Sequence, residues 1–223
     1  MNKWFKVLSV ALCGLSVAAC STTQIKEVSS ARGTLVEFTE NIGEQSTHLV
    51  YLVHADVVRV NYGKSGSYTL FDRRTKTLYD VNAKDETVTV IKGTKPILTE
   101  QELGVVITEN ESHLVEGGAS THFRFEKDGK VCLNVIGMSD LLPAVEVAIA
   151  EMATVRANDP RLADIDPQSC EYIVRIFANS KTEIVGLPVR QWNKDGYSKF
   201  MNTYRVQMDL EGNSAWYKLP EWY

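Results

Sequence analysis

Four cysteines carry the most reactive side chains of this 223-residue sequence, at Cys13, Cys20, Cys132 and Cys170. A cysteine can act as a nucleophile, ligate a metal or form a disulfide, and a cysteine behind an apolar leader can mark a processing site. No histidine or further cysteine lies at metal-ligand spacing to Cys132 or Cys170, so the sequence does not favour a zinc site. The role of each cysteine therefore depends on the compartment in which the chain works.

Motifs with a known catalytic mechanism are absent from the sequence. It contains no Gly-x-Ser-x-Gly, His-Glu-x-x-His, Walker loop or Gly-x-Gly-x-x-Gly. The four histidines are scattered, and a site built on His48 and His54 would lack further ligands. The charged residues of segment 72–80 could form a polar site, although charges at a hairpin end are usually solvated. We expect no enzymatic activity, no metal and no cofactor.

The N-terminal segment has the pattern of an export signal. Lys3 and Lys6 precede an uncharged run at 7–17, which is shorter than the ~20 apolar residues that span a bilayer. The motif VAAC at 17–20 resembles the lipobox of bacterial lipoproteins, with Val17 where that family prefers Leu. In that family the cysteine becomes the first mature residue and carries lipid on its sulfur and its amine. The resemblance implies that Cys20 is the lipid attachment point.

This resemblance also implies an organisation and a location. Residues 1–19 would be a signal peptide, 20–32 a lipidated tether, and 33–223 a single periplasmic domain. Ser21, which is not Asp, favours the outer membrane under the enterobacterial sorting rule. The expected location is the inner leaflet of the outer membrane, facing the periplasm. Several acyl chains suffice as an anchor, because each buried methylene contributes ~0.8 kcal/mol.

Lipidation of Cys20 changes the interpretation of the other cysteines. Cys13 would leave with the signal peptide, so Cys132 and Cys170 would remain as a pair in an oxidising compartment. We favour a disulfide between these two cysteines, and two buried free thiols are the alternative.

The charge of the mature chain argues against nucleic acid as a partner. Removal of the signal peptide changes the formal net charge from -4 to about −6, whereas nucleic-acid binding requires clustered basic residues. The mature length of about 200 residues suits one domain with a sizeable core.

Turn residues and alternating apolar residues predict an antiparallel sheet after Gly33. The Asp128-Gly129 pair is a strong signal for a hairpin turn over 122–136. Strands are expected at 34–39, 48–61, 67–71, 77–81, 87–92, 105–108, 183–192, 198–210 and 214–219. The predicted class is α+β, a curved antiparallel sheet (a half-open barrel) packed on a few helices.

Two helices interrupt the predicted strands. One is expected at 139–156, capped by Ser139 or Asp140, and one at 167–178, capped by Asp166. Cys170 would lie in the first turn of the second helix, so a disulfide to Cys132 would attach the helical segment to the sheet.

Aromatic side chains are frequent on the predicted strands. They could form the core between sheet and helices, or they could line an apolar cavity on the concave face. The candidate cavity residues are Tyr51, Tyr68, Phe71, Phe123, Phe125, Trp192, Tyr204 and Trp216.

The order of these elements, together with the lipobox, resembles the lipoprotein-carrier (LolA/LolB-like) half-barrel family. Segment 56–93 resembles its successive hairpins, and segment 182–192 resembles a late strand entered through Gly-x-Pro. The resemblance implies a curved sheet that wraps one side of a few helices and encloses a cavity for acyl chains. The protruding apolar loop with which the receptor of this family transfers its cargo has no match.

Two functions are compatible with these features. The first is a membrane-anchored, non-catalytic module that binds an apolar ligand or a lipidated or extended partner. The second is a structural or assembly subunit of a cell-envelope complex that acts through protein–protein contacts.

Overall fold

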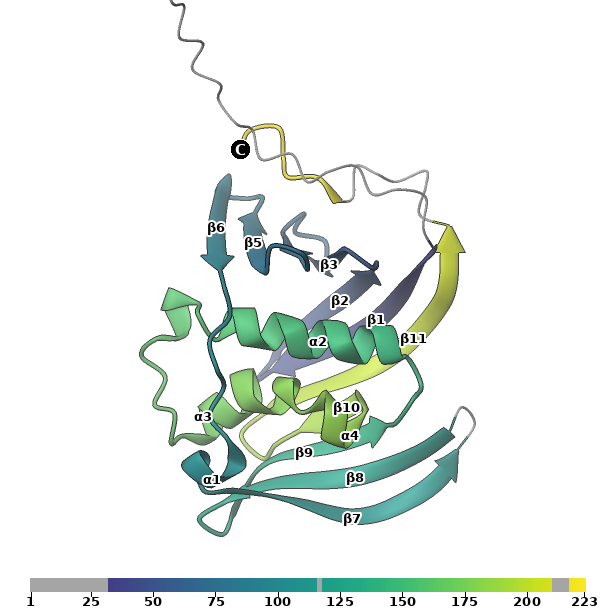
Figure 1. The fold of residues 1–223 in the computed structure, drawn as a ribbon, viewed down its shortest axis with the longest axis vertical. Helices are drawn as coiled ribbons and strands as arrows, with labels where there is room; N and C mark the ends of the chain where they lie inside the picture. Colours follow the sequence, from purple (N-terminus) through teal and green to yellow (C-terminus); the bar gives the residue numbers. More distant parts are fainter. Residues whose placement is uncertain (1–31, 116–117, 210–216) are drawn as a thin grey trace, which may run out of the picture.

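A computed structural model describes residues 32–115, 118–209 and 217–223. The predicted signal peptide, Cys20, nearly all of the tether and Trp216 lie outside these residues. The described chain forms an open 11-stranded antiparallel sheet that curves around a few helices (Figure 1), which confirms the α+β class. No helix of the described segments is long and apolar enough to cross a membrane.

The sheet consists of two halves that meet where the first strand pairs with the last. Its strand order is β6-β5-β4-β3-β2-β1-β11-β10-β9-β8-β7. The first half contains β1 (Arg32–Ile42), β2 (Gln45–Val53), β3 (Val57–Tyr62), β4 (Tyr68–Asp72), β5 (Thr77–Asn82) and β6 (Thr87–Lys92). The second half contains β7 (Val105–Val115), β8 (Gly118–Lys127), β9 (Lys130–Met138), β10 (Leu187–Trp192) and β11 (Tyr197–Asp209).

Helical segments lie on the concave face of the sheet (Figure 1). The longest is α2 (Pro143–Arg156), followed by the short 3₁₀ helix η1 (Pro160–Leu162). A second helical stretch combines α3 (Cys170–Tyr172), the π-helix η2 (Ile173–Phe177) and the 3₁₀ helix η3 (Ala178–Ser180). Two single turns complete the set, α1 (Glu100–Leu103) and α4 (Thr182–Val185).

Two predicted strands were wrong. The strand expected at 48–61 is a hairpin, because the His54 N–H donates to the Val57 carbonyl (2.9 Å) and the chain turns between β2 and β3. The strand expected at 183–192 begins only at Leu187, after α4 and after Gly186, whose φ of 71° ends the helix. Residues 217–219 are not a strand, and the rest of the segment predicted at 214–219 lies outside the described residues.

Both predicted helices begin later than expected. Asp140 has a φ of 60°, which is incompatible with a right-handed helix, so α2 begins at Pro143, where a missing N–H costs nothing. The Asp166 carboxylate accepts from the Gln168 N–H in a preceding turn (2.9 Å). Ser169 is the N-cap of α3, since its hydroxyl accepts from the Tyr172 N–H (3.2 Å).

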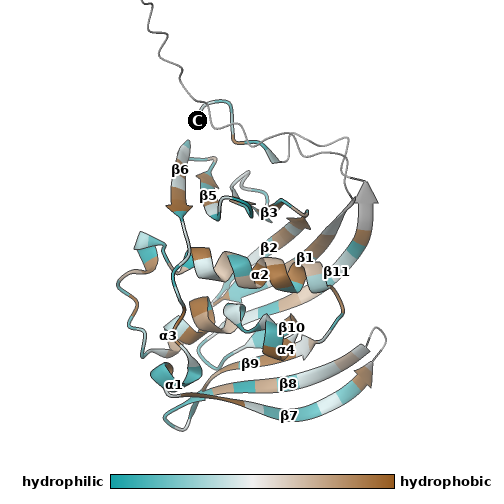
Figure 2. Cartoon of the chain, viewed as in Figure 1, coloured by the Kyte–Doolittle hydropathy of each residue, from teal (hydrophilic) through white to brown (hydrophobic). Residues whose placement is uncertain are grey.

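The hydrophobic core is divided between the two halves of the sheet. The apolar side of α2 packs on one face of β1–β5 in a first cluster that includes Phe38, Phe71 and Ile149. The segment α3–η2 packs on β8 and β9 in a second cluster that includes Phe125 and Phe177. Figure 2 shows hydrophobic residues along α2, whereas the segment between α2 and α3 is mostly hydrophilic. A third cluster, on the outer face of the first half, includes Tyr217 near the C-terminus.

Candidate functional site

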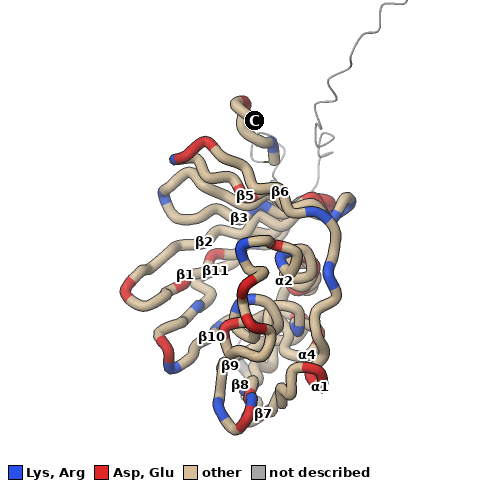
Figure 3. The backbone as a smooth tube through the Cα atoms, turned by 90° about the vertical axis from the view of Figure 1, so that its left-hand side faces the viewer, with Lys and Arg blue, Asp and Glu red and all other residues tan. Residues whose placement is uncertain are grey.

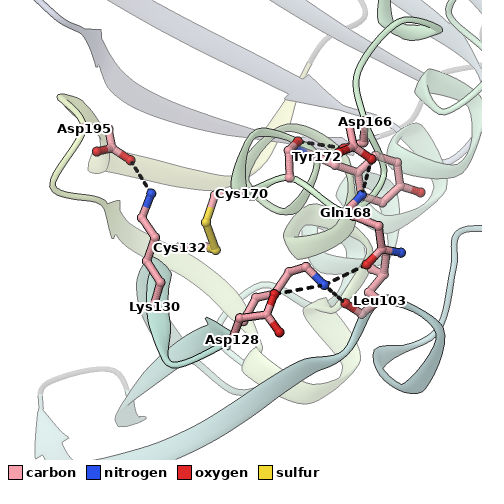
Figure 4. The surroundings of a disulfide bond; sticks show 11 residues. Leu103, Asp128, Lys130, Cys132, Asp166, Gln168, Cys170, Tyr172 and Asp195 are labelled. Carbon is pink, nitrogen blue, oxygen red and sulfur yellow. Dashed lines mark hydrogen bonds and ion pairs between the residues drawn. A yellow bond between two sulfur atoms is a disulfide. The ribbon is translucent and has the colours of Figure 1, made fainter.

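The predicted cysteine pair forms a disulfide. Cys132 on β9 and Cys170 at the start of α3 are bonded, with their Cα atoms 5.0 Å apart (Figure 4). The bond attaches the second helical stretch to the sheet, as the sequence predicted. Lipidation of Cys20 stays a prediction, because that residue lies outside the described part of the chain.

The eight aromatic residues proposed for an apolar cavity are distributed over several environments. Phe71 is fully buried in the first cluster, and Phe125 is fully buried in the second together with Phe123. Tyr51 borders the first cluster. Each of these side chains packs in or against a hydrophobic core cluster, and Phe123 also borders a small pocket beside β7.

The remaining members of that set lie elsewhere. Tyr68 packs in the third cluster and also borders the cleft described below. Trp192 stacks on His122, with ring centroids 5.3 Å apart, and Tyr204 is exposed. Strand alternation explains the dispersal: Tyr68 and Phe71 are an odd number of residues apart on β4 and therefore point to opposite faces. Trp216 lies outside the described residues.

A cleft of about 950 Å³ lies at the turn ends of the strands, between the first half of the sheet and the helical segments. Its walls come from the end of β1, the hairpins of β3–β6, η1, the α3–η2 stretch and the start of β11. Its lining mixes three kinds of side chain. The apolar and aromatic ones are Ile42, Tyr62, Tyr68, Val81, Leu162, Val174 and Tyr197, and the charged ones are Glu40, Asp80, Arg156, Asp159, Arg161, Glu171, Arg175, Asp195 and Lys199.

Asp80 on β5 is the centre of a polar network in this cleft. Its carboxylate accepts from Arg156 at the end of α2 (3.1 Å) and from Arg161 on η1. Asp159 accepts from the Arg161 guanidinium as well (2.8 Å). Burial alone would raise the pKa of Asp80, but the hydrogen bonds and charge of Arg156 outweigh it and hold that pKa below its ordinary value. The network therefore ties the C-terminal end of α2 to the sheet.

Two hydroxyl groups extend this network across the sheet. The Thr69 hydroxyl donates to Asp80 (2.5 Å) and is hydrogen-bonded to the Tyr62 hydroxyl (2.6 Å). Burial raises the pKa of Tyr62 above its ordinary value. Tyr62 is therefore a neutral phenol at physiological pH. Because the Thr69 hydrogen is donated to Asp80, the Tyr62 hydroxyl donates to Thr69, and its oxygen can accept a further hydrogen bond.

Lys199 on β11 forms a second polar cluster in the cleft. Its Nζ donates to the Tyr51 hydroxyl (3.1 Å) and lies over the rings of Phe38 (4.8 Å) and Tyr51 (5.1 Å). Burial would lower the pKa of Lys199, but Tyr51, Tyr197 and Glu40 raise it above its ordinary value. The side chain is therefore a cation at neutral pH.

The wall formed by α3 is fixed to the second half of the sheet at several points (Figure 4). Besides the disulfide, Lys127 at the end of β8 donates to the Leu103 carbonyl and to Gln168 Oε1 (2.7 Å). Lys130 at the start of β9 pairs with Asp195 in the β10–β11 turn (3.7 Å). The disulfide and the Lys127–Gln168 hydrogen bond therefore hold the start of α3 to the sheet, whereas the Lys130–Asp195 pair joins β9 to the β10–β11 turn.

The cleft can offer hydrogen bonds, charges and apolar contacts to a ligand. It presents cations, carboxylates, phenols and short apolar side chains together, and most of its charges are neutralised by one another. In the described part of the chain, no group of three or more His, Cys, Asp or Glu residues is placed to hold a metal ion.

Sequence reasoning identified only part of this site. It named Asp80 among the charged residues of 72–80, but Arg73 and Lys76 of that segment bind Glu151 instead (2.7 and 2.9 Å). It missed Lys199. The only pattern that points to this residue is weak: Lys199 is two residues after Tyr197, so both side chains lie on the same face of the strand.

Comparisons with known proteins indicate no activity for this chain. No family model matches it, and no curated protein matches it. An uncharacterized conserved protein from Thermus thermophilus is similar at a TM-score of 0.45 and 8% identity, over 86% of this chain and 87% of that chain. PNGF-II is similar at TM-scores of 0.42 and 0.41 in two crystal forms, at 7% identity. Those matches cover 84% and 82% of this chain but 30% of PNGF-II.

Proposed function

We propose that this chain is a lipid-anchored, non-catalytic protein of the bacterial cell envelope that binds an amphipathic ligand in the cleft. The observation that carries the proposal is the cleft itself. Its volume of about 950 Å³ lies in the range of ligand sites, roughly 300–1,000 Å³. It is the product of a curved sheet whose concave face is only partly covered by helices.

The lining of the cleft favours an amphipathic ligand over a purely apolar one. An alkane-like ligand would leave the carboxylates and guanidinium groups of the walls without water, which is unfavourable. A purely ionic ligand would gain nothing from Ile42, Leu162 and Val174. A ligand with one polar end and one apolar end can satisfy both parts of the lining.

The lipid anchor on Cys20 and the outer-membrane location belong to this proposal. The support is the lysine-containing start, the apolar run and the VAAC motif at 17–20. Membership of the LolA/LolB-like half-barrel family is part of it too, supported by the open sheet curved around helices. Beneath α2 and α3 the buried side chains pack into two core clusters, and the ligand site that we propose is the cleft.

Ligand retention tests the proposed function. The full chain is expressed in a Gram-negative bacterium, purified from membranes and analysed by native mass spectrometry. Thr89→Trp places an indole in the cleft from β6, and Thr203→Trp is the matched control on an exposed position of β11 outside the cleft. We expect the unmodified chain and the control to retain a bound amphiphile and Thr89→Trp to lose it. Equal retention by both variants, or no bound molecule in the unmodified chain, would refute the proposal.

A second candidate, an assembly subunit, is favoured by the edge strand β7. Val106 and Leu114 on this strand are 61% and 91% exposed, and an unpaired edge strand can pair with another chain. Under this function, Leu114→Lys would abolish capture of a stoichiometric envelope partner and leave ligand retention unchanged. Capture that is insensitive to Leu114→Lys would exclude this edge as the interface.

A further inference from the structure

The cations that line the cleft differ in their partners. They are Arg156, Arg161, Arg175 and Lys199. The first two pair with carboxylates of the Asp80 network, and Arg175 pairs with Glu171 (3.2 Å). For Lys199, by contrast, no carboxylate oxygen of the described residues lies within 4.0 Å of Nζ. Among the cleft cations, Lys199 is therefore the one without a direct ion pair in the described residues, although Glu40 lies beside it in register.

Lys199 lines the cleft and can donate hydrogen bonds there, and the Tyr51 hydroxyl lies next to its Nζ. An ammonium group has three donors, and one of them is used for the Tyr51 hydroxyl. Because that hydroxyl oxygen accepts from Lys199, its own hydrogen is left to donate. Tyr197 is occupied differently, since its hydroxyl donates to Gln191 Oε1 (3.0 Å). An acceptor bound here would therefore face Nζ and the Tyr51 hydroxyl.

Aromatic contacts fix the position of the ammonium group. Nζ lies over the rings of Phe38 and Tyr51, and Phe38 is fully buried in the first core cluster. A lysine held between rings loses less side-chain entropy on binding than a surface lysine does. The donor is thus placed before the ligand arrives.

Glu40 limits the charge that this position accepts. It pairs in register with Lys199 across β1 and β11, and both side chains line the cleft. Glu40 opposes every negative charge that a ligand brings beside Lys199, and the one positive charge of Lys199 can offset only one of them. The position therefore tolerates a singly charged group better than a doubly charged one.

We propose that Lys199 and Tyr51 bind the monoanionic head group of an amphiphile whose apolar part lies along Ile42, Leu162 and Val174. The inference rests on the proposed function and names the ligand class of the same cleft. The shared chemistry is one anionic oxygen group on an apolar chain. A fatty-acid carboxylate and a single-chain phosphodiester lipid are its two sources.

Calorimetric titration of the purified full chain tests the head-group preference. The probes are decanoate, decan-1-ol of the same chain length, and lysophosphatidylglycerol as the phosphodiester source. We expect at least one of the two anionic probes to bind about tenfold or more tightly than the alcohol, since a hydrogen bond to a charged group is stronger than one to a neutral group. The tighter of the two anionic probes identifies the source.

Variants locate the preference at Lys199. Lys199→Gln should abolish it, Tyr51→Phe should reduce it several-fold, and Lys199→Arg should retain most of it. Lys194→Gln, in the β10–β11 turn and outside the cleft, is the charge-matched control and should change nothing. If Lys199→Gln does not fold, the Tyr51→Phe and Lys199→Arg pair still decides the question.

Different failures identify which proposal is wrong. If the alcohol and both anions bind equally and Thr89→Trp blocks all three, the cleft binds amphiphiles and the head-group assignment is overturned. If the anion preference persists in Lys199→Gln, it arises elsewhere and the assignment is again overturned. If no probe binds the unmodified chain, both the head-group assignment and the proposed function fail.

Discussion

The two halves of the sheet hold their helices by different means. In the first half, α2 is attached through charges: Glu151 binds Arg73 (2.7 Å) and Lys76 (2.9 Å), and Arg156 binds Asp80. In the second half, α3 is attached to β9 by a covalent bond between two cysteines. Figure 3 shows charged residues at the hairpin turns and along the segment that follows α2.

Helix length explains the difference. A 14-residue helix such as α2 presents a full apolar side to the sheet, so packing holds it and the ion pairs fix its orientation. The second helical stretch, 170–180, is shorter and changes from α to π to 3₁₀ geometry, and a disulfide at its first residue adds to its packing on β8 and β9. Both attachments border the cleft, so one wall depends on protonation and the other on oxidation.

Removal of the disulfide should produce the largest effect. Replacing both cysteines, Cys132→Ala with Cys170→Ala, should lower the free energy of unfolding by about 4 kcal/mol for a separation of 38 residues. Urea unfolding measures the change, and reduction of the unmodified protein should reproduce it. Hydrogen exchange should increase in η2 more than in α2. Equal increases in both helices would show that the two attachments are not independent.

Loss of the Asp80 carboxylate should have the next largest effect. Asp80→Asn removes the negative charge and one of the two oxygens that accept from Arg156 and Arg161, and its NH₂ group would face these cations. The Arg156 side chain, only 23% exposed, would lose its main ion-pair partner. We expect unfolding to become easier by about 2 kcal/mol, with faster exchange at the end of α2. Asp128→Asn at an exposed turn is the control and should change stability by less than about 0.5 kcal/mol. If Asp80→Asn instead increased hydrogen exchange only in η2, the difference that we describe between the two halves would be contradicted.

Acid should weaken the first half through the buried carboxylates that bind its arginines and lysines. Burial opposes ionisation of Asp80, Asp159 and Glu151, but their arginine and lysine partners lower each pKa below its ordinary value. A lowered pKa stabilises the fold above the unfolded value of about 4 and loses that stabilisation as pH falls further. We expect a loss of roughly 1–2 kcal/mol between about pH 6 and pH 3. In Asp80→Asn the free energy of unfolding, measured by urea titration at each pH, should decrease less steeply as the pH falls. An identical pH dependence in both proteins would contradict this assignment.

The smallest effect is expected from one exposed ion pair in the second half, Lys130 with Asp195. Lys130 and Asp195 are 3.7 Å apart, and both are about half exposed. Lys130→Ala should change the free energy of unfolding by less than about 0.5 kcal/mol, because exposed pairs contribute little. A loss near 2 kcal/mol, measured by the same urea titration, would mean that charges hold this half as well.

Local signals in the sequence predicted most of the sheet and the disulfide. The Asp128-Gly129 turn joins β8 and β9, since both residues have the positive φ that such a turn requires. The cysteine pair was predicted from the oxidising compartment that the lipobox implies and from the two cysteines that remain in the mature chain. Helix starts were placed too early because Ser139 and Asp140 are good caps in isolation, and the sequence does not reveal that Asp140 turns left-handed.

The cleft could not be predicted in the same way. Its key charges come together through strand pairings between distant segments, such as Glu40 with Lys199, for which no local pattern exists. The sequence shows that aromatic residues are frequent on the strands, but the face of the sheet to which each side chain points depends on the residue at which its strand begins. A turn at Ala55 and Asp56, inside what read as one strand, changes the pairing of Tyr51 and thereby its surroundings.

The pairing of β1 with β11 has a consequence for the order of assembly. Thr39 and Asn202, hydrogen-bonded across this pair (3.0 Å), are 163 positions apart in the chain. Each half can form its own hairpins early, but the seam between them closes only after the last strand has emerged. Until then β1 and β10 each present an unpaired edge at what becomes the middle of the sheet (Figure 1). A chain that stops before β11 would consist of two sheets without a common cleft.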